Sequence, residues 1–217
     1  MKAKFITLEG IEGSGKTSSI KSITDLLDHQ NTSYVVTREP GGSSIGSELR
    51  SILLDTNTEI SSEVELMLML ADRKDHVEKV ILPNLEVGNW VISDRFMDSS
   101  VAYQGGGRGL DKEMINAFSK KLNLPIPDLT LLFDLPVEIS LSRVKARGEL
   151  DRFEQEELAF HNRIREAYLE LAKENISRIQ IIDSSQEIER MLKNVEQIIE
   201  TFFNCLLYTS PSPRDRG

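Results

Sequence analysis

The sequence predicts an α/β fold in which a five-stranded parallel sheet is flanked by helices. Short apolar segments alternate with segments of helical period, which is typical of a parallel sheet covered on both faces. The chain also turns polar where most of these segments stop, and ligands of such sheets bind beyond the carboxyl ends of the strands. The predicted strands are residues 5–8, 33–37, 90–94, 128–134 and 177–183.

A glycine-rich loop follows the first predicted strand. From Gly10 the sequence spells G-x-x-x-x-G-K-T, and a helical segment begins directly after Thr17. This strand, loop and helix form the context of a phosphate-binding P-loop, in which backbone N–H groups and the helix N-terminus bind anions. Lys16 is expected to reach the β- and γ-phosphates of a nucleotide, and the Thr17 hydroxyl to bind Mg²⁺.

The elements of the first half continue this alternation. Residues 44–54 carry apolar side chains at helical spacing. A longer helix is expected to begin at Ser61 or Ser62, with Glu65 placed as in a capping box, and to end near Pro83.

The second half adds five helical stretches. The two in residues 98–122 are separated by a glycine-rich break at Gly105–Gly109. Pro136 begins a further helix, and a polar segment then precedes a helix that ends at about Asn175. The last helix has an apolar stripe from Ile188 to Phe202.

These elements form one predicted domain, residues 1–204. Residues 205–217 lack a helical period and contain two prolines, so we expect a disordered tail, which also resembles foreign, non-native sequence.

Composition narrows the possible partners. The 217 residues have 39% hydrophobic and 28% charged side chains, as a globular protein does. The net charge of −9 argues against nucleic-acid and anionic-membrane binding, which need basic surfaces. No apolar run approaches the length of a membrane span, and the single cysteine, Cys205, fits a reducing compartment. We therefore expect a cytoplasmic protein.

A second motif lies at the end of the third predicted strand, where Asp94 and Arg95 open the run DRFMDSSVAYQ. An acid at a strand end can bind Mg²⁺ in P-loop enzymes, and arginine suits a phosphate group because its guanidinium is a planar fork. Without a P-loop elsewhere in the chain, this pair would be read as a solvated ion pair.

Three further motifs follow the P-loop in order: REPGG from Arg38, DRFMDSSVAYQGGGRG from Asp94 and PDLTLLFDL from Pro127. With GIEGSGKT, they resemble the thymidylate kinase family from Lys4 to about Phe203. The resemblance implies an ATP-dependent nucleoside monophosphate kinase with Mg²⁺ and a homodimeric state. Its substrates would be ATP and dTMP, and its products ADP and dTDP, for dTTP synthesis.

Two alternatives remain open from the sequence. One is a kinase for another pyrimidine nucleoside monophosphate such as dUMP. The other is a nucleotide-binding relative without catalysis.

The resemblance also assigns the phosphate-binding residues. Its common bacterial kind has an acid in the P-loop and arginines in a small helical lid, here about residues 143–157. Arg143 would then pack on adenine, while Arg147 and Arg152 close over the transferring phosphoryl group. A solvated charged helix is the alternative for this segment, because five acids lie beside the arginines. The implied ATP site is Gly10, Glu12, Gly13, Ser14, Gly15, Lys16, Thr17 and Arg143, the catalytic residues are Lys16, Arg95, Arg147 and Arg152, and Thr17 and Asp94 bind the metal.

For dTMP, the resemblance places two arginines, Arg38 and Arg95, at the phosphate and Glu12 at the sugar 3′-hydroxyl. Arg73 would donate to thymine O4, and Tyr103 would exclude a 2′-hydroxyl. Met69 stands where most relatives have a phenylalanine that stacks on thymine, so stacking of two rings is lost there. The complete implied dTMP site is Glu12, Arg38, Glu39, Pro40, Met69, Arg73, Arg95, Ser99, Ser100, Tyr103 and Gln104.

Overall fold

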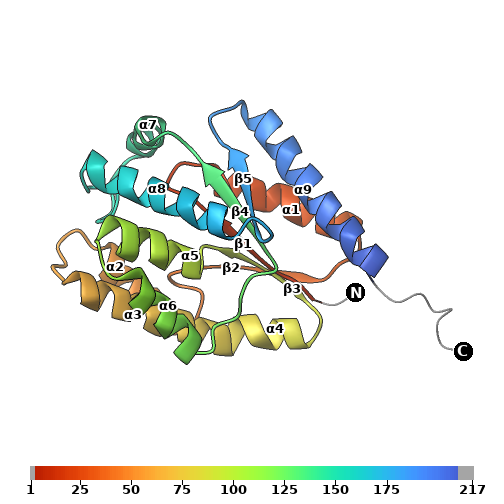
Figure 1. The fold of residues 1–217 in the computed structure, drawn as a ribbon, viewed down its shortest axis with the longest axis horizontal. Helices are drawn as coiled ribbons and strands as arrows, with labels where there is room; N and C mark the ends of the chain where they lie inside the picture. Colours follow the sequence, from red (N-terminus) through yellow and green to blue (C-terminus); the bar gives the residue numbers. More distant parts are fainter. Residues whose placement is uncertain (1–2, 210–217) are drawn as a thin grey trace, which may run out of the picture.

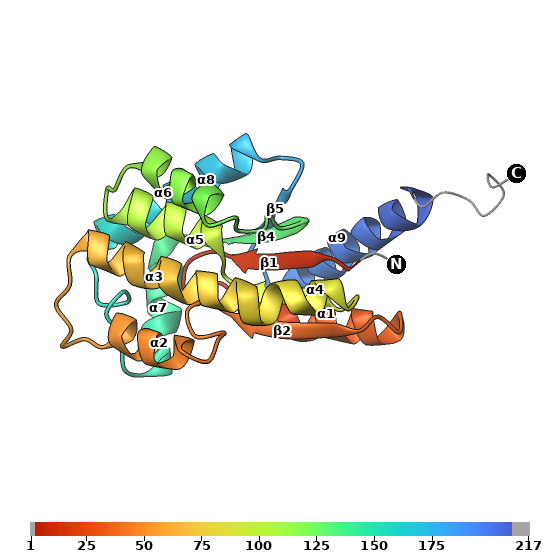
Figure 2. The ribbon, with the colours of Figure 1, turned by 90° about the horizontal axis from the view of Figure 1, so that it is seen from below.

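The computed structural model describes residues 3–209 and contains a five-stranded sheet at its centre. The strand order is β2-β3-β1-β4-β5, and every neighbouring pair is parallel. Figure 2 shows β1 and β2 pointing the same way, towards α2. The predicted fold class is confirmed. The strands are β1 (Phe5–Glu9), β2 (Tyr34–Arg38), β3 (Trp90–Asp94), β4 (Leu129–Asp134) and β5 (Ile179–Asp183).

The register of the sheet brings three strand ends to one place. Leu8 of β1 and Arg38 of β2 both lie opposite Asp94 of β3. The chain leaves β3 alongside its neighbours, because the Arg95 amide donates to Leu8 O at 2.9 Å and the Glu39 amide donates to Asp94 O at 2.9 Å. Polar residues from three distant sequence segments therefore meet at the carboxyl edge.

Two long helices cover one face of the sheet, α1 (Lys16–His29) and α9 (Ile188–Thr209) (Figure 1). Apolar side chains of β1, β3 and β4 pack against both helices in a continuous buried cluster. This packing uses the apolar stripe that the sequence predicts for the last helix, and Trp90 stacks on Phe203 with ring centroids 4.5 Å apart.

The remaining helices lie on the opposite face or at the carboxyl edge of the sheet (Figures 1 and 2). Leu66 and Leu70 of α3 pack on Phe5 and Val91, while α8 packs on β4. The bounds are α2 (Gly46–Leu54), α3 (Ser62–His76), η1 (Val77–Ile81), α4 (Leu82–Glu86), α5 (Met97–Ser100), η2 (Val101–Gly107), α6 (Lys112–Lys121), α7 (Val137–Arg147) and α8 (Leu158–Glu174).

The helix that begins with α3 does not end near Pro83, as the sequence suggests. It widens into the π-helical turn η1 and continues through Pro83 to Glu86. A proline lacks an N–H and leaves an upstream carbonyl without its partner. The wider turn accommodates the ring, and the Asn84 side-chain amide donates to Val80 O at 2.8 Å.

The predicted glycine-rich break is also helical in its first part, since η2 runs to Gly107. These glycines allow η2 to approach α8 closely. A Cβ on Gly106 would lie 2.5 Å from Ala167 Cβ, and one on Gly107 would lie 2.6 Å from a Phe160 ring carbon. The glycines therefore serve close helix packing, and the chain leaves the helix only after them.

The last helix is longer than the sequence predicts. Helix α9 continues to Thr209, past residue 205, where we expected a disordered tail to begin. The apolar spacing of Phe202 and Phe203 is repeated in the sequence by Leu206 and Leu207, and this repeat extends the helical pattern. The remainder of the predicted tail, residues 210–217, lies outside the described residues.

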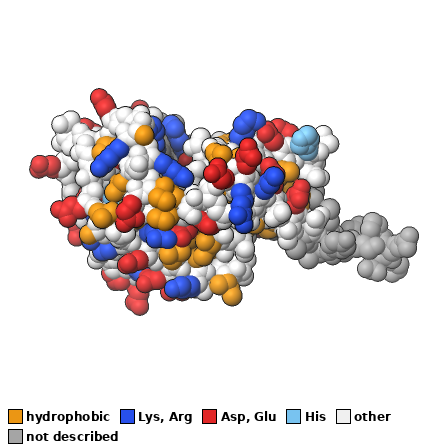
Figure 3. Space-filling view, turned by 90° about the horizontal axis from the view of Figure 1, so that it is seen from above, with side chains coloured by type: hydrophobic (Ala, Val, Ile, Leu, Met, Phe, Trp, Pro, Cys, Tyr) orange, Lys and Arg blue, Asp and Glu red, His pale blue; other side chains and the backbone are white. Residues whose placement is uncertain are grey.

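The surface matches the mixed charge of the sequence. On the face shown in Figure 3, acidic and basic side chains are interspersed. Among the described residues, no helix is both long and apolar enough to cross a membrane.

Candidate active site

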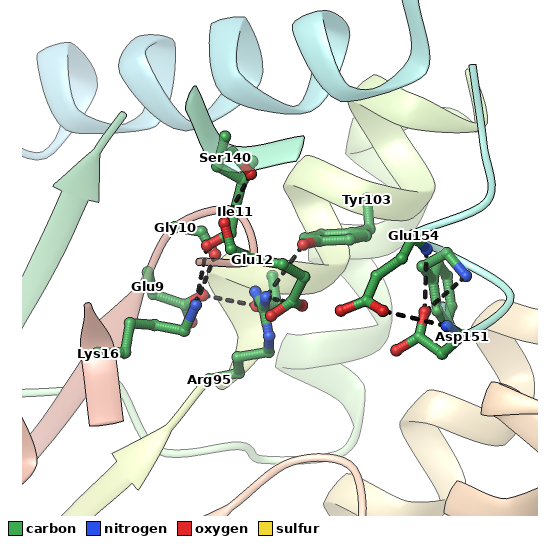
Figure 4. A network of polar contacts seen from close by, with 12 residues as sticks. Glu9, Gly10, Ile11, Glu12, Lys16, Arg95, Tyr103, Ser140, Asp151 and Glu154 are labelled. Atoms are coloured by element: carbon green, nitrogen blue, oxygen red, sulfur yellow. Dashed lines mark hydrogen bonds and ion pairs between the residues drawn. The ribbon is translucent and has the colours of Figure 1, made fainter. Parts of the chain in front are cut away.

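The P-loop connects β1 to α1 and is bent by glycines. Gly10 has φ of +134°, and a Cβ there would lie 2.5 Å from Phe133 O. Gly15, with φ of +93°, caps the N-terminus of α1. Only glycine adopts both conformations easily, so these positions depend on the residue type. Lys16 is buried, and its Nζ donates to Gly10 O at 3.1 Å and Ile11 O at 3.0 Å (Figure 4).

Helix α7 supports the loop from one side. Ser140 Oγ donates to Glu12 O at 2.6 Å, and Arg143 Nη1 donates to Gly13 O at 3.0 Å. These bonds fix carbonyl groups of the loop, which leaves its backbone N–H groups for an anion. Arg143, expected to pack on adenine, thus stands beside the P-loop.

A cavity of about 330 Å³ opens beside this loop at the carboxyl edge of the sheet. All the residues expected to contact dTMP line it, together with both predicted metal ligands and Arg147. They come from the P-loop and the start of α1, from β2 and the turn after it, from α3, from β3 through η2, and from the end of α7. The fold thus brings together predicted site residues that are up to 135 positions apart in the sequence, from Glu12 to Arg147.

Arg95 and Glu12 face each other in this cavity and form an ion pair (Figure 4). The Arg95 guanidinium also donates to Tyr103 Oη at 3.0 Å, Ser99 Oγ at 3.2 Å and Tyr168 Oη at 3.2 Å. Burial alone would raise the pKa of Glu12, but the charges of Arg95 and Lys16 outweigh it and lower that pKa to about 2. Glu12 is therefore ionised at neutral pH.

Glu9, at the end of β1, holds the backbone that carries Arg95. Its carboxylate accepts from Phe96 N at 2.8 Å, Ser99 Oγ at 2.6 Å and Tyr168 Oη at 2.9 Å. Arg95 has φ of +73°, a conformation that costs free energy for a side chain of this kind and needs such support. Burial and the nearby charge of Asp98 raise the pKa of Glu9 to about 7.

A second buried network forms the wall contributed by α3. Arg73 Nε donates to Glu39 Oε2 at 2.5 Å, and Arg73 Nη1 donates to Ser100 Oγ at 2.7 Å. His76 Nδ1 lies 2.8 Å from Glu39 Oε1. This network fixes the turn after β2, where Glu39 precedes a cis Pro40. The guanidinium of Arg73 is thereby held at the cavity with its plane defined.

The residues expected to bind Mg²⁺ fit that ion. Asp94 and Thr17 both line the cavity, and Asp94 Oδ1 is buried without a hydrogen-bond partner in the described chain. Mg²⁺ prefers oxygen ligands and commonly takes only one or two from the protein, the rest being phosphate and water oxygens. Within residues 3–209 no cluster of three or more acidic, histidine or cysteine side chains forms a fuller metal site.

The lid arginines occupy different places. Arg147 lines the cavity and pairs with Glu154, while its side chain remains 60% exposed. Arg152 does not line the cavity, contrary to the expectation that it closes over the phosphoryl group. Its Nη1 donates to Glu65 Oε2 at 2.8 Å and its Nε donates to Leu53 O at 2.9 Å. Tertiary hydrogen bonds to α2 and α3 turn this arginine away from the phosphate side.

Glu65 also differs from its expected role in a capping box. Ser61 caps α3 by accepting from Val64 N at 3.3 Å, whereas the Glu65 side chain is buried at the cavity wall. A single sequence offers the capping pattern but does not show which arginines surround the carboxylate.

Five cavity residues were not expected from the sequence. They are Arg50, Leu54, Asp151, Phe153 and Glu154. Arg50 Nη1 donates to Pro40 O at 2.8 Å, so α2 contributes a cation next to the turn after β2. Arg50 is the one basic residue of the 44–54 helix, and this isolated charge is the only sequence signal for it. Leu54 ends the same helix, and Asp151, Phe153 and Glu154 lie in the predicted lid, but the sequence does not show which lid side chains face the cavity.

Comparisons with known proteins match the motifs and the fold. A family model described as thymidylate kinase matches residues 8–195. The thymidylate kinase of Carboxydothermus hydrogenoformans is 46% identical over 204 residues, which cover 92% of this chain and 98% of that protein. The thymidylate kinase of Nitrosospira multiformis is also 46% identical, with 94% and 100% covered. The chain belongs to the thymidylate kinase family.

A solved structure supports the same family. The thymidylate kinase from Ehrlichia chaffeensis has a TM-score of 0.76 and 31% identity, covering 92% of this chain and all of that one. Thymidylate kinases phosphorylate dTMP to dTDP with ATP, so the predicted nucleoside monophosphate kinase activity is confirmed at the level of the family. The alternatives, another pyrimidine acceptor or a non-catalytic relative, find no support among these matches.

Proposed function

We propose that dTMP binds in the cavity at the carboxyl edge and receives the γ-phosphoryl group of ATP held by the P-loop. The observation that carries this proposal is the convergence of every expected dTMP contact with Thr17, Asp94 and Arg147 in one cavity. Phosphoryl transfer needs little covalent help from the protein, because positioning and charge neutralisation lower its barrier. The cavity supplies both, since it joins an anion-binding loop to a ring of arginines.

On the donor side, Gly10, Gly13, Ser14 and Gly15 present the P-loop backbone to the phosphates, and Lys16 neutralises their charge. In this structure Lys16 Nζ bonds to loop carbonyls, and it would exchange these for phosphate oxygens when ATP binds. Thr17 and Asp94 would bind Mg²⁺, which neutralises charge on the β- and γ-phosphates when bound.

On the acceptor side, Arg95 and Arg38 bind the phosphate of dTMP, and we propose that Arg50, which lines the same cavity, joins them. A phosphate oxygen of dTMP forms the new bond to the γ-phosphorus while the bond to the ADP oxygen breaks. Burial lowers the pKa of Arg50, with a further contribution from the charge of Arg38, so two adjacent cations await an anion. Arg147 closes over the transferring group.

Glu12 has two parts in this proposal. Its carboxylate neutralises the charge of Arg95 in the structure. When dTMP is bound, the carboxylate accepts a hydrogen bond from the sugar 3′-hydroxyl. Tyr103 stands over Arg95, with the ring centroid 4.9 Å from the guanidinium carbon, and restricts the space for a 2′-hydroxyl.

Around the base, Arg73, Ser100 and Gln104 provide polar groups, with Ser99 beside them, while Met69 and Phe153 provide apolar surface. Glu39 and Pro40 complete the wall. A site that hydrogen-bonds its substrate rejects analogues chiefly because its own buried groups are then left unpaired.

A coupled assay with ATP, Mg²⁺ and a panel of dTMP, dUMP, dCMP and AMP tests this function. We expect ADP formation with dTMP at the highest kcat/KM and loss of turnover after chelation of Mg²⁺. Asp94→Asn should raise the Mg²⁺ concentration needed for half-maximal rate about tenfold or more. Turnover without an acceptor, or a preference for AMP, would contradict the proposal.

The same proposal includes a cytoplasmic homodimer. The exposed Met67 and the partly buried Phe118 and Leu122 border an open apolar groove along α3, and a second copy would cover it. Light scattering at assay concentration should give about twice the chain mass, and a monomer would contradict this part alone.

A further inference from the structure

Glu65 is a buried carboxylate on the first turn of α3 that joins three segments of the cavity wall. Its side chain is 1% exposed and accepts from Gln104 Nε2 at 2.9 Å, Arg108 Nε at 3.2 Å and Arg152 Nη1 at 2.8 Å. A carboxylate is buried at acceptable cost only when such donors surround it. The arrangement is therefore a built site with a defined orientation for each partner.

The two arginines place an aromatic side chain of the predicted lid. Arg152 lies over the Phe153 ring at 4.6 Å and Arg108 lies over it at 5.7 Å. Phe153 in turn meets Tyr103 edge-on, with centroids 5.7 Å apart, and both rings line the cavity. Glu65 thus fixes the position of Phe153 through its ion pairs with Arg108 and Arg152, and neither arginine lines the cavity.

Of the three partners, only Gln104 lines the cavity proposed to hold the base. An ionised carboxylate can only accept, so Glu65 requires the –NH₂ group of the Gln104 amide on its side. The carbonyl oxygen Oε1 then points to the opposite side of the Cγ–Cδ bond, away from Glu65. Rotating the amide by 180° would place two acceptors in contact, which costs the lost bond and adds repulsion.

This fixed amide distinguishes two classes of pyrimidine. Thymine and uracil have an N3–H donor that an amide oxygen can accept, whereas cytosine has an N3 acceptor beside an amino donor. A freely turning glutamine can match either edge. A glutamine held in one orientation matches only one.

We infer that Glu65 is a positioning residue that determines base specificity, because it locks the Gln104 amide so that its oxygen accepts from N3–H and opposes cytosine. The inference rests on the proposed binding of dTMP in this cavity. It assigns Glu65 no contact with substrate.

The decisive variant is Glu65→Gln, which keeps the shape but can donate or accept, so Gln104 is free to turn. We expect the ratio of kcat/KM for dTMP over dCMP to fall about tenfold. The ratio for dTMP over dUMP should change less than about twofold, because these bases share the same edge. A general loosening of the wall would not separate the two ratios.

Two further variants test whether Glu65 affects specificity through Gln104. In a Gln104→Ala background, Glu65→Gln should leave the dTMP/dCMP ratio unchanged, as expected for an effect exerted through Gln104. Glu65→Asp keeps the charge for both arginines and withdraws the carboxylate from Gln104, so it should still lower the ratio while melting closer to the wild type. If Glu65→Gln does not fold, Glu65→Asp takes its place in the test.

Asp128→Asn, which breaks a pair with Lys4 at the opposite edge of the sheet, is the matched control and should leave both ratios unchanged.

An unaltered dTMP/dCMP ratio in folded Glu65→Gln overturns the inference, as does an equal fall of the dTMP/dUMP ratio. The inference is also overturned if Glu65→Gln lowers the dTMP/dCMP ratio by the same factor in the Gln104→Ala background. Failure of the wild type to phosphorylate dTMP counts instead against the proposed function, so the two failures are distinguishable.

Discussion

At the scale of single residues, the chemistry of the cavity depends on which charges are already paired. Arg95 is held by Glu12, whereas Arg147 reaches the cavity from an exposed position with Glu154 as its partner. A cation held by one flexible pair can move onto an anion more readily than one fixed on several sides. Under the proposed function, Arg95 is therefore the cation that positions the acceptor, and Arg147 is the cation that acts during transfer.

Arg147→Ala should therefore lower kcat about a hundredfold or more, while the KM for dTMP changes by a factor of about three or less. Steady-state assays with dTMP as the variable substrate measure both constants. Lys145→Ala removes a charge from the same helix but not from the cavity, and it is the control. Equal effects on kcat and KM in Arg147→Ala would indicate a structural role.

Glu9 gives a pH dependence that belongs to the folded state. Burial, with the charge of Asp98, raises its pKa to about 7, above the 4.5 of an unperturbed glutamate. Between these values the folded chain holds a proton that the unfolded chain has released, so the free energy of unfolding falls as pH rises from about 4.5 to 7.

Glu9→Gln cannot titrate, so the melting temperature of the variant minus that of the wild type should increase from pH 5 to pH 8. The corresponding change in the free energy of unfolding is about 3 kcal/mol at most, since each unit of difference in pKa between the folded and unfolded chain is worth about 1.4 kcal/mol. Calorimetric melting across this range measures it. A difference that is constant with pH would show that Glu9 ionises at its ordinary pKa.

At the scale of elements, close approach of η2 to α8 positions the cavity wall. Tyr103 and Gln104 lie on η2, and the glycines that follow them bring this segment onto α8. The π-helical turn and the glycines act together, because a wider turn and a missing Cβ both admit a neighbouring helix.

Gly106→Ala should destabilise the fold by about 1–3 kcal/mol, because its Cβ would overlap Ala167 Cβ and lie 2.9 Å from Arg163 O. The neighbouring Gly105→Ala is the matched control, since its nearest contact is the flexible Lys112 side chain at 3.2 Å. Urea unfolding of both variants gives the comparison. Equal stability of the two would refute close packing as the reason for these glycines.

At the scale of the whole molecule, an acidic protein concentrates basic side chains in one cavity. The net charge is −9, yet Arg38, Arg50, Arg73, Arg95 and Arg147 all line the same space. The net charge therefore bears on bulk partners such as nucleic acid, while a nucleotide responds to the local field of the cavity.

The residues expected at dTMP come from the resemblance to the thymidylate kinase family, whereas the sequence by itself determined the strands and the P-loop. These features are encoded locally: apolar runs specify buried strands, and glycines specify the loop. A parallel sheet then requires the strand ends to share one edge. For this reason Glu12, Asp94 and Arg95 could be assigned to one site before any coordinates.

Only the tertiary structure decided the partners of charged side chains. Arg152 was expected at the phosphoryl group and lies against Glu65, while Glu65 was expected to cap a helix. Arg50 enters the cavity from α2 without a motif. An ion pair forms between residues that folding brings together from distant positions, and its geometry depends on burial and on competing donors. Such pairings leave no periodic trace in a single sequence.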